Sequence, residues 1–152
     1  MSLTPGSSAG YLVNHLARLF AAALQDRIKP LGLSTGVFPI MLHLWQKDGL
    51  TQSDLVTLVG IEQATMANTL ARMERDGLIL RRPDPDDGRS KRIFLTEVGR
   101  AKQTGAMAAA NAANADIMAA LTTGEREQMM QLLRKAIEGK AGQGRQSQVH
   151  AE

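Results

Sequence analysis

Two short helical patterns, joined by a tight turn that contains a glycine, restrict the fold of this chain more than any other feature. The first covers residues 51–59 and opens with Thr51-Gln-Ser-Asp54, which has the T-x-x-D form of a capping box. Gly60 ends it, and apolar residues at helical spacing then indicate a second helix over residues 62–76. Two short helices joined by a tight, glycine-containing turn predict a helix-turn-helix.

The residues after this motif predict a β-hairpin. Gly77 is suited to end the second helix, because helices often close with a glycine in the left-handed region. Residues 78–82 and 91–95 then carry β-forming side chains, and a loop with three aspartates and one arginine separates them. Since a two-stranded hairpin is marginal by itself, we expect it to pack against the preceding helices.

Helical patterns also precede the helix-turn-helix. Apolar residues near i, i+4, i+7 spacing indicate an amphipathic helix over residues 11–29, which Pro30 ends. A nearly all-apolar run predicts a buried helix over residues 33–47, with Ser34 or Thr35 as its N-cap.

Two further helices are expected after the hairpin. An alanine-rich segment, residues 97–121, predicts a long helix, because alanine is the best helix former. A second capping box, Thr122 to Glu125, opens a last helix. Residues 1–9 and 139–152 lack periodicity, so we expect a disordered N-terminus and a flexible tail.

Composition narrows the class of protein. A chain of 152 residues with 43% hydrophobic and 22% charged residues suits one folded domain. No apolar run reaches the roughly 18 residues that a membrane span needs, and no secretory signal is present. We therefore expect a soluble, cytoplasmic protein that does not contact membranes.

Several kinds of chemical site are excluded or disfavoured. The chain has no cysteine, which excludes disulfides and thiolate catalysis. His15, His43 and His150 lack the spacing that places two imidazoles on one helical face, so no metal site and no cofactor are expected. The sequence offers no pairing of nucleophile and base and no glycine-rich phosphate loop, which argues against an enzyme.

Net charge does not decide the function. The chain carries +3, but residues 51–100 hold eight basic and eight acidic side chains. Binding to DNA requires cations at the spacing of phosphates and not a high total. The placement of individual cations is therefore the useful observation.

The order of elements and three motifs resemble the MarR family of bacterial transcription regulators. The motifs are TQSDLVTLVG, the turn ERDGLI after the second helix of the helix-turn-helix, and DDGRSKRIFLTEVG. The resemblance extends over residues 10–138 and implies a mainly α fold with a small β-hairpin. It implies a winged helix-turn-helix domain over 34–96, a wing over 78–95, and dimerisation helices at 10–29 and 97–138.

The resemblance places the helix 62–76 in the DNA major groove, where side chains near a helix N-terminus read base edges. Asn and Gln can pair bidentately with adenine, and short polar groups of this type are Gln63, Thr65, Asn68 and Thr69. Family members often carry arginine where this chain has Asn68. Arg72 is assigned to phosphate, with a surface carboxylate as the alternative. Ser53 either binds phosphate at a helix N-terminus or serves only as part of the cap.

The loop within residues 83–92 matches the D-x-R motif of the family wing. The resemblance implies that Arg89 enters the minor groove while Asp87 holds it by a charge-assisted pair, with Lys91 nearby. A narrow A·T-rich minor groove favours an inserted guanidinium. The alternative is a solvated charged turn. A calcium loop fails on spacing, because Leu95 stands where the bidentate glutamate belongs.

The family likeness also implies a homodimer, built from the first and last helices, on a pseudo-palindromic operator of double-stranded DNA. It further implies a pocket for a small lipophilic or aromatic effector. The candidate lining residues are His15, Phe38, Leu42 and Trp45, although an aromatic stripe is more often plain core. The resulting hypothesis is a ligand-responsive repressor. The alternative is a winged-helix module that binds protein without specific DNA binding.

Overall fold

The helical patterns of the sequence all appear in the structure, a computed structural model that describes residues 2–149 and the side chains of residues 2–142. The chain divides into two units, residues 1–114 and 115–152. The first unit contains α1 (Ala9–Ile28), the 3-10 helix η1 (Lys29–Leu31), α2 (Phe38–Gln46), β1 (Leu50–Thr51), α3 (Gln52–Val59), α4 (Gln63–Arg75), β2 (Ile79–Pro83), β3 (Lys91–Leu95), α5 (Glu97–Ala101) and most of α6 (Gln103–Ile117). The second unit contains the end of α6 and α7 (Thr123–Val149).

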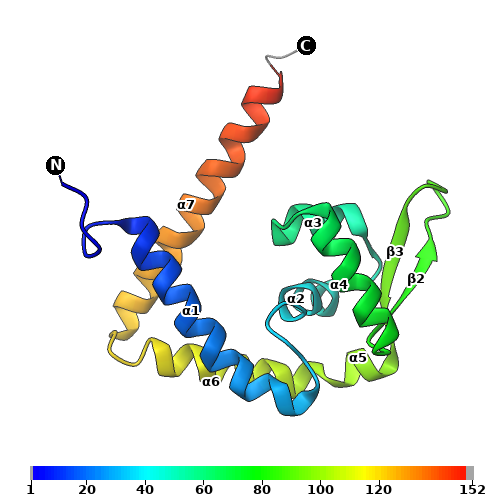
Figure 1. Ribbon diagram of the computed structural model, residues 1–152, viewed down its shortest axis with the longest axis horizontal. Coiled ribbons are helices and arrows are strands. Elements are labelled where there is room, and N and C mark those ends of the chain that lie inside the picture. Colours follow the sequence, from blue (N-terminus) through cyan, green and yellow to red (C-terminus); the bar gives the residue numbers. More distant parts are fainter. Residues whose placement is uncertain (1, 150–152) are drawn as a thin grey trace. The chain divides into compact units, whose positions relative to one another are not determined.

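The predicted helix-turn-helix is confirmed at α3 and α4. The Thr51 hydroxyl accepts a hydrogen bond from the backbone N–H of Asp54, and the Asp54 carboxylate accepts one from the N–H of Thr51, both at 3.0 Å. This reciprocal capping box starts α3, and Gly60, with a φ of 73°, ends it. Figure 1 shows α2, α3 and α4 grouped beside the hairpin of β2 and β3.

One apolar core holds these elements together. The buried side chains come from α2, α3, α4 and the hairpin, with one alanine from α6, and Ile28 and Leu33 close it from the segment around η1. Its largest fully buried members are Ile28, Ile40, Met41, Leu44, Leu55, Met66, Leu70, Met73, Ile79 and Ile93. The hairpin is therefore packed against the helices, as its marginal stability requires.

The sheet has three antiparallel strands in the order β1-β3-β2, one strand more than the sequence analysis expects. Leu50 pairs with Ile93, and Ile79 pairs with Leu95. Two residues are too few to show a strand period, which explains why β1 is not predicted. The short strand matters because it joins α2 and α3 directly to the hairpin.

Asp48 connects β1 to β3 and α5. One oxygen of its carboxylate accepts hydrogen bonds from the backbone N–H of Leu95 at 2.9 Å and of Gly49 at 3.1 Å. The other accepts from the guanidinium of Arg100 at 3.2 Å. Charge-assisted hydrogen bonds of this kind fix the end of the hairpin relative to the helix that follows it.

Two helices differ from their expected lengths. The segment before α2 forms a turn in which the backbone N–H groups of Val37 and Phe38 both donate to the Ser34 carbonyl, so α2 begins at Phe38 and not at 33. The expected long helix 97–121 is divided into α5 and α6. The short α5 packs closely against Leu78, the residue just before β2, and this contact sets its direction separately from that of α6.

Both ends of the chain contain more regular structure than expected. Thr4 and Ser7 form a hydrogen-bonded turn, and Ser8 caps α1, where residues 1–9 are expected to be disordered; Met1 lies outside the described residues. The helix α7 starts at the predicted capping box and continues to Val149, where a tail over 139–152 is expected. No proline interrupts this stretch, and its alanine and long polar residues are compatible with a helix. Residues 150–152 lie outside the described part.

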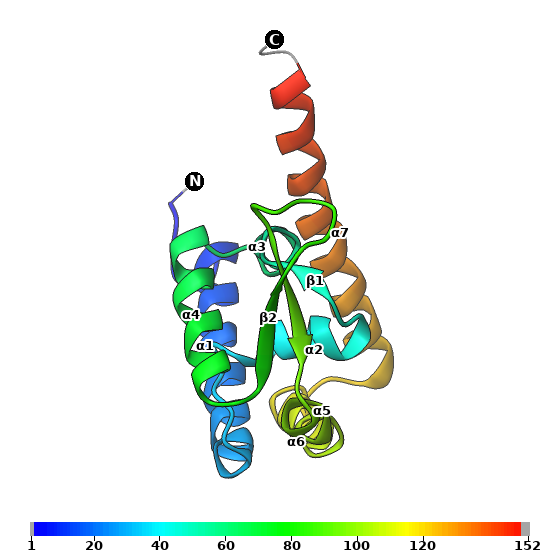
Figure 2. The same ribbon diagram turned by 90° about the vertical axis from the view of Figure 1, so that its right-hand side faces the viewer.

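The helix α5 approaches Leu78, the residue just before β2, and lies below the hairpin in Figure 2. A Cβ atom added at Gly99 would lie 2.2 Å from the carbonyl oxygen of Leu78, which no relaxation of a side chain can relieve. The Gly99 carbonyl also accepts a hydrogen bond from the indole N–H of Trp45 at 3.0 Å. No helix in the described residues is long and apolar enough to cross a membrane.

We expect Gly99→Ala to lower the free energy of unfolding by about 3 kcal/mol, because backbone must move to admit the methyl group. Gly105→Ala is the matched control. Its added Cβ would meet only the side chain of Leu31 at 3.5 Å, an ordinary contact, so it should stabilise α6 by about 0.5–1 kcal/mol. Urea unfolding followed by circular dichroism measures both. Equal effects of the two substitutions would contradict this account.

Candidate nucleic-acid interface

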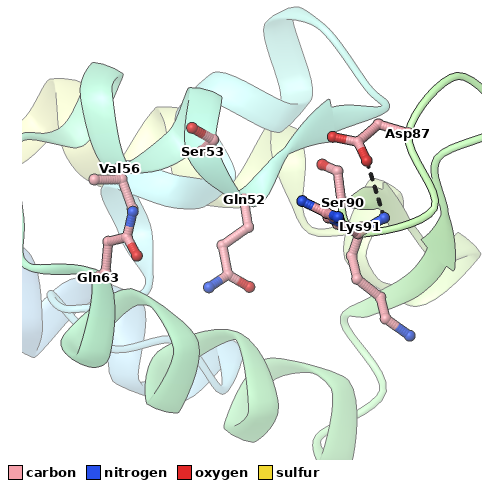
Figure 3. A pocket seen from close by; sticks show the side chains of 8 residues that line it. Gln52, Ser53, Val56, Gln63, Asp87, Ser90 and Lys91 are labelled. Carbon is pink, nitrogen blue, oxygen red and sulfur yellow. Dashed lines mark hydrogen bonds between the residues drawn. The ribbon is translucent and has the colours of Figure 1, made fainter.

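A polar cleft lies where the N-terminal ends of α3 and α4 meet the loop between β2 and β3, which we call the wing tip. The cleft has a volume of about 320 Å³. It is lined by Gln52, Ser53, Val56, Gln63, Asp87, Arg89, Ser90 and Lys91. In Figure 3, the side chains of Gln52 and Gln63 come from the two helices, Ser90 comes from the wing tip, and Lys91 comes from the start of β3.

The cleft brings together five of the nine residues predicted to bind DNA: Ser53, Gln63, Asp87, Arg89 and Lys91. It adds two polar residues that sequence reasoning missed, Gln52 and Ser90. The first turn of α3 points into the cleft, so Gln52 could have been found from its place beside Ser53. Ser90 has no signal in the sequence apart from its position in the wing.

The exposed face of α4 carries most of the predicted base-reading residues. Gln63, Thr65, Asn68 and Arg72 are exposed. Thr69 is not, because it is only 4% exposed and its hydroxyl donates to the Thr65 carbonyl at 2.8 Å. Thr69, which the sequence analysis groups with the base-reading residues, therefore lies on the side of the helix that faces the core.

Helix geometry explains the burial of Thr69. At 3.6 residues per turn, it lies three residues after Met66 and four before Met73, both of which are fully buried. The threonine thus belongs to the stripe that faces the core. Its hydroxyl also accepts a hydrogen bond of 3.4 Å from the guanidinium of Arg72, which positions that side chain along the helix.

Asp87 shapes the turn at the wing tip. Its carboxylate accepts a hydrogen bond from the backbone N–H of Arg89 at 3.0 Å, marked by the dashed line in Figure 3. Its carbonyl accepts from the N–H of Ser90 at 3.0 Å. An aspartate that bonds the backbone two residues on is a common turn former.

This arrangement corrects the expected charge-assisted pair at the wing tip. Within the described residues, Asp87 forms no ion pair with the guanidinium of Arg89. The carboxylate is occupied by backbone, so it fixes the path of the loop. The guanidinium of Arg89 is exposed and is left available for a ligand.

A second aspartate holds the base of the wing. Asp84 is 8% exposed, and its carboxylate accepts hydrogen bonds from the backbone N–H of Asp86 at 3.1 Å and from Arg92 Nε at 3.2 Å. The hydrogen bond from Asp86, followed by that from Arg92, holds the pKa of the Asp84 carboxyl below its ordinary value, although burial opposes this. Arg92 also donates to the Gly49 carbonyl at 2.9 Å. Arg92 is therefore a structural cation that joins the wing to β1.

Glu74 makes a similar link between α4 and β2. Its carboxylate accepts hydrogen bonds from the Arg81 guanidinium at 3.1 and 3.3 Å and from the Arg81 backbone N–H at 3.0 Å. These bonds hold the pKa of the Glu74 carboxyl below its ordinary value. In the part of the chain that the structure describes, Arg81 and Arg92 are thus paired, whereas Arg72, Arg89 and Lys91 form no ion pair.

A second cavity, of about 420 Å³, lies between α1, α2 and α6 within the first unit. Of the four residues proposed for an effector pocket, Phe38 and Leu42 line it. His15 and Trp45 do not. The ring of His15 packs edge-on against Tyr11 on the exposed face of α1, and Trp45 packs edge-on against Phe38.

The remaining walls of this cavity come from α1, from the turn before α2 and from α6, and sequence reasoning missed all of their residues. The residues are Phe20, Ala21, Leu24, Thr35, Met107, Ala110, Asn111 and Asn114. An alanine-rich helix shows no functional pattern, so nothing in the sequence marks Asn111 or Asn114. The described residues contain no group of three or more metal-ligating side chains.

Residues 33–91 match the family model described as MarR family. A MarR-family transcriptional regulator from Silicibacter pomeroyi has a similar structure, with a TM-score of 0.76 and 29% identity, over 91% of this chain and 96% of that chain. The part of the chain that matches the MarR family model therefore contains the helix-turn-helix and most of the wing. Its fold is the winged helix of MarR-type transcriptional regulators.

Two further structures of this fold were solved with ligands. A MarR-family regulator from Listeria monocytogenes, complexed with a 26mer DNA, has a TM-score of 0.81 and 22% identity, over 90% of this chain and 91% of that chain. CouR from Rhodococcus jostii, bound to p-coumaroyl-CoA, has a TM-score of 0.78 and 20% identity, over 89% and 95%. At this identity, both comparisons show the shared fold.

We expect Asp84→Asn to destabilise the protein more at pH 7 than at pH 3. Because the pKa of the folded carboxyl is lowered, its stabilising contribution is present above about pH 4 and is lost as the pH falls through the folded pKa. Urea unfolding at both pH values measures the difference between variant and wild type. Asp86→Asn removes a neighbouring charge that forms no ion pair in the described residues, and should change stability by less than about 0.5 kcal/mol. A destabilisation by Asp84→Asn that is equal at both pH values would contradict the role of the carboxylate.

Proposed function

We propose that this protein is a sequence-specific DNA-binding transcriptional regulator, and that it acts as a homodimeric repressor whose operator affinity falls when a small molecule binds. The observation that carries the proposal is the cleft in which α3, α4 and the wing tip present polar groups and unpaired cations together. The function involves binding and no catalytic step.

The helix α4 is assigned to the major groove. Its exposed face presents Gln63, Thr65 and Asn68 near the N-terminal end, the part of a recognition helix that reaches base edges. The amides of Gln63 and Asn68 offer the donor and acceptor pair that matches adenine. Thr69 is left out of the base-reading set because it is buried.

The wing tip is assigned to the minor groove. Arg89 is exposed and has no carboxylate partner in the described residues, while Asp87 keeps the loop in a defined turn. An unpaired guanidinium costs less to insert into a narrow groove than one that must first leave an ion pair. Lys91, the first residue of β3, is assigned to the adjacent phosphates.

Phosphate contacts are assigned to the cleft between these two elements. Gln52 and Ser53 lie in the first turn of α3, where free backbone N–H groups and the helix dipole favour an anion. Ser90 faces the same cleft from the wing. Such contacts fix the position of a protein on the duplex and carry no sequence information themselves.

The exposed apolar residues of α1 and α7 support a dimer of two copies of this chain. On α1, Leu12, Val13 and Leu19 are each about half exposed, and on α7, Leu132 is 58% and Ile137 69% exposed. Apolar side chains at this density on a helix are usually covered by a partner. A two-fold dimer would read an inverted repeat with half-sites about one DNA turn apart.

The cavity between α1, α2 and α6 is assigned to the effector. Its volume of about 420 Å³ suits a small molecule. Its walls include Phe38 and Leu42 from α2, the helix that shares an apolar core with the helix-turn-helix. A ligand would lower operator affinity only if it binds more tightly to a conformation that fits DNA poorly.

The test is selection of bound duplexes from a random DNA pool, with Arg89→Ala in parallel. We expect the wild type to enrich an inverted repeat, and Arg89→Ala to bind it at least about tenfold more weakly with a smaller salt slope. Arg134→Ala, an exposed arginine of α7, is the matched control and should retain the wild-type enrichment. Failure to enrich any sequence at low salt would favour a winged-helix module that binds protein.

We expect Asn68→Ala to relax the sequence preference at one position in each half-site. The loss should be about 1–3 kcal/mol against the preferred base, because one bidentate amide contact is removed. Binding titrations with the selected repeat and with duplexes changed at single positions measure it. A uniform loss across all duplexes would assign Asn68 to backbone contact instead.

A further inference from the structure

A hollow on the helix-turn-helix lies beside the polar cleft. It has a volume of about 520 Å³ and is lined by Val56, Gly60, Ile61, Glu62, Gln63 and Thr65. Val56 and Gln63 also line the cleft, and Figure 3 shows these two side chains next to each other. The hollow is therefore continuous with the surface that faces DNA in the proposed function.

The floor of the hollow is apolar. Val56 and Ile61 are half-buried, and part of each side chain packs against the core while the rest stays uncovered. Gly60 has no side chain, and a Cβ atom added to it would have no neighbour within 4 Å, so the hollow stays open at the turn. A group that covers this floor favourably must itself be apolar.

We propose that the hollow receives the C5-methyl group of a thymine in the operator, and that Val56 and Ile61 thereby determine part of the sequence preference. The inference rests on the proposed DNA-binding function and deepens it by naming a base that the protein recognises. In the major groove, the C5-methyl group distinguishes thymine from the other bases, and apolar side chains read it by direct contact.

The charge at the edge of the hollow favours a base over the DNA backbone. Glu62 is exposed, makes no capping hydrogen bond with its side chain and forms no ion pair in the described residues. A carboxylate repels phosphate, but it can accept a hydrogen bond from the amino group of a cytosine. The hollow thus suits base edges inside the groove, whereas Arg89 and Lys91 of the cleft suit phosphates.

The rim places the hollow at the end of α4 that is assigned to base reading. Gln63 and Thr65 are the first and third residues of α4, and both are exposed. Successive base pairs are about 3.4 Å apart along the duplex. A base pair held by Gln63 therefore brings the next pair within reach of Val56 and Ile61.

The test replaces thymine by deoxyuridine, which lacks only the C5-methyl group, at one position at a time in the selected inverted repeat. We expect one position in each half-site at which the full chain binds about fourfold more weakly, because burial of one methyl group contributes a factor of this size. Replacement at that position in both half-sites should weaken binding about fifteenfold. Fluorescence anisotropy titrations at fixed salt measure the affinities. The inference is overturned if no single replacement weakens binding by more than about twofold.

Val56→Thr tests whether the methyl group lies in this hollow. Threonine has nearly the shape of valine but places a hydroxyl group in the floor, so the difference between thymine and deoxyuridine should fall below about twofold. Leu58→Thr is the matched control, because Leu58 is 50% exposed on the same helix and lines neither the hollow nor the cleft. It should keep the fourfold difference. If Val56→Thr also keeps it, the methyl group contacts another residue and the inference fails.

Ile61→Thr makes the same change at the other residue of the floor. It provides the test if Val56→Thr does not fold, which circular dichroism would show. The expected result is again a difference between thymine and deoxyuridine of less than about twofold. An unchanged fourfold difference in a folded Ile61→Thr protein would count against the hollow.

These measurements separate the inference from the proposed function. Enrichment of an inverted repeat that binds equally well with thymine and with deoxyuridine would reject the thymine contact and leave the regulator intact. Failure to enrich any sequence would reject the proposed function and this inference with it.

Discussion

The contacts of Arg92 fix the position of the wing relative to the helix-turn-helix. Its guanidinium bonds both the Asp84 carboxylate at the base of the wing and the Gly49 carbonyl next to β1. Because β1 runs directly into the capping box of α3, one side chain joins the wing to the start of the helix-turn-helix. The cleft that faces DNA in our proposal exists only while these two parts keep their positions. A partly buried ion pair suits this task, since breaking it leaves a charge without a partner.

The distribution of carboxylates separates structural cations from available ones. Glu74 binds Arg81, and Asp84 binds Arg92, so two of the five cations of the hairpin are paired within the fold. The third carboxylate, that of Asp87, accepts a hydrogen bond from backbone and leaves the guanidinium of Arg89 exposed. This explains how a region with equal numbers of acidic and basic residues can still present positive charge at one edge. Local pairing, and not net charge, decides what the surface offers to phosphate.

The sequence was sufficient to predict features that short-range patterns determine, and insufficient to predict features that depend on tertiary contacts. The capping boxes, Gly60 and the alternation of Ile93 and Leu95 follow from short-range patterns, and the structure contains each of them. The resemblance to a family supplied the interface, but it assigned Asp87 to the wrong partner. Thr69 was grouped with the base-reading residues although it faces the core. Consecutive residues of a helix point in different directions, so Asn68 is exposed while Thr69 is buried. The cavity-lining asparagines of α6 could not be found, since only the packing of three helices gives them a common space.

A continuous set of contacts leads from the cavity toward the wing. Phe38 lines the cavity and packs edge-on against Trp45, whose indole N–H donates to Gly99 in α5. Gly99 in turn lies directly on the carbonyl of Leu78, the residue just before β2. Contiguity alone does not couple two sites, because a ligand shifts an equilibrium only by its difference in affinity between two conformations. The tight contact at Gly99 nevertheless limits which conformational changes could produce such a difference in affinity. Without a side chain to compress, any displacement of Trp45 must either break its hydrogen bond or move α5 and the hairpin together.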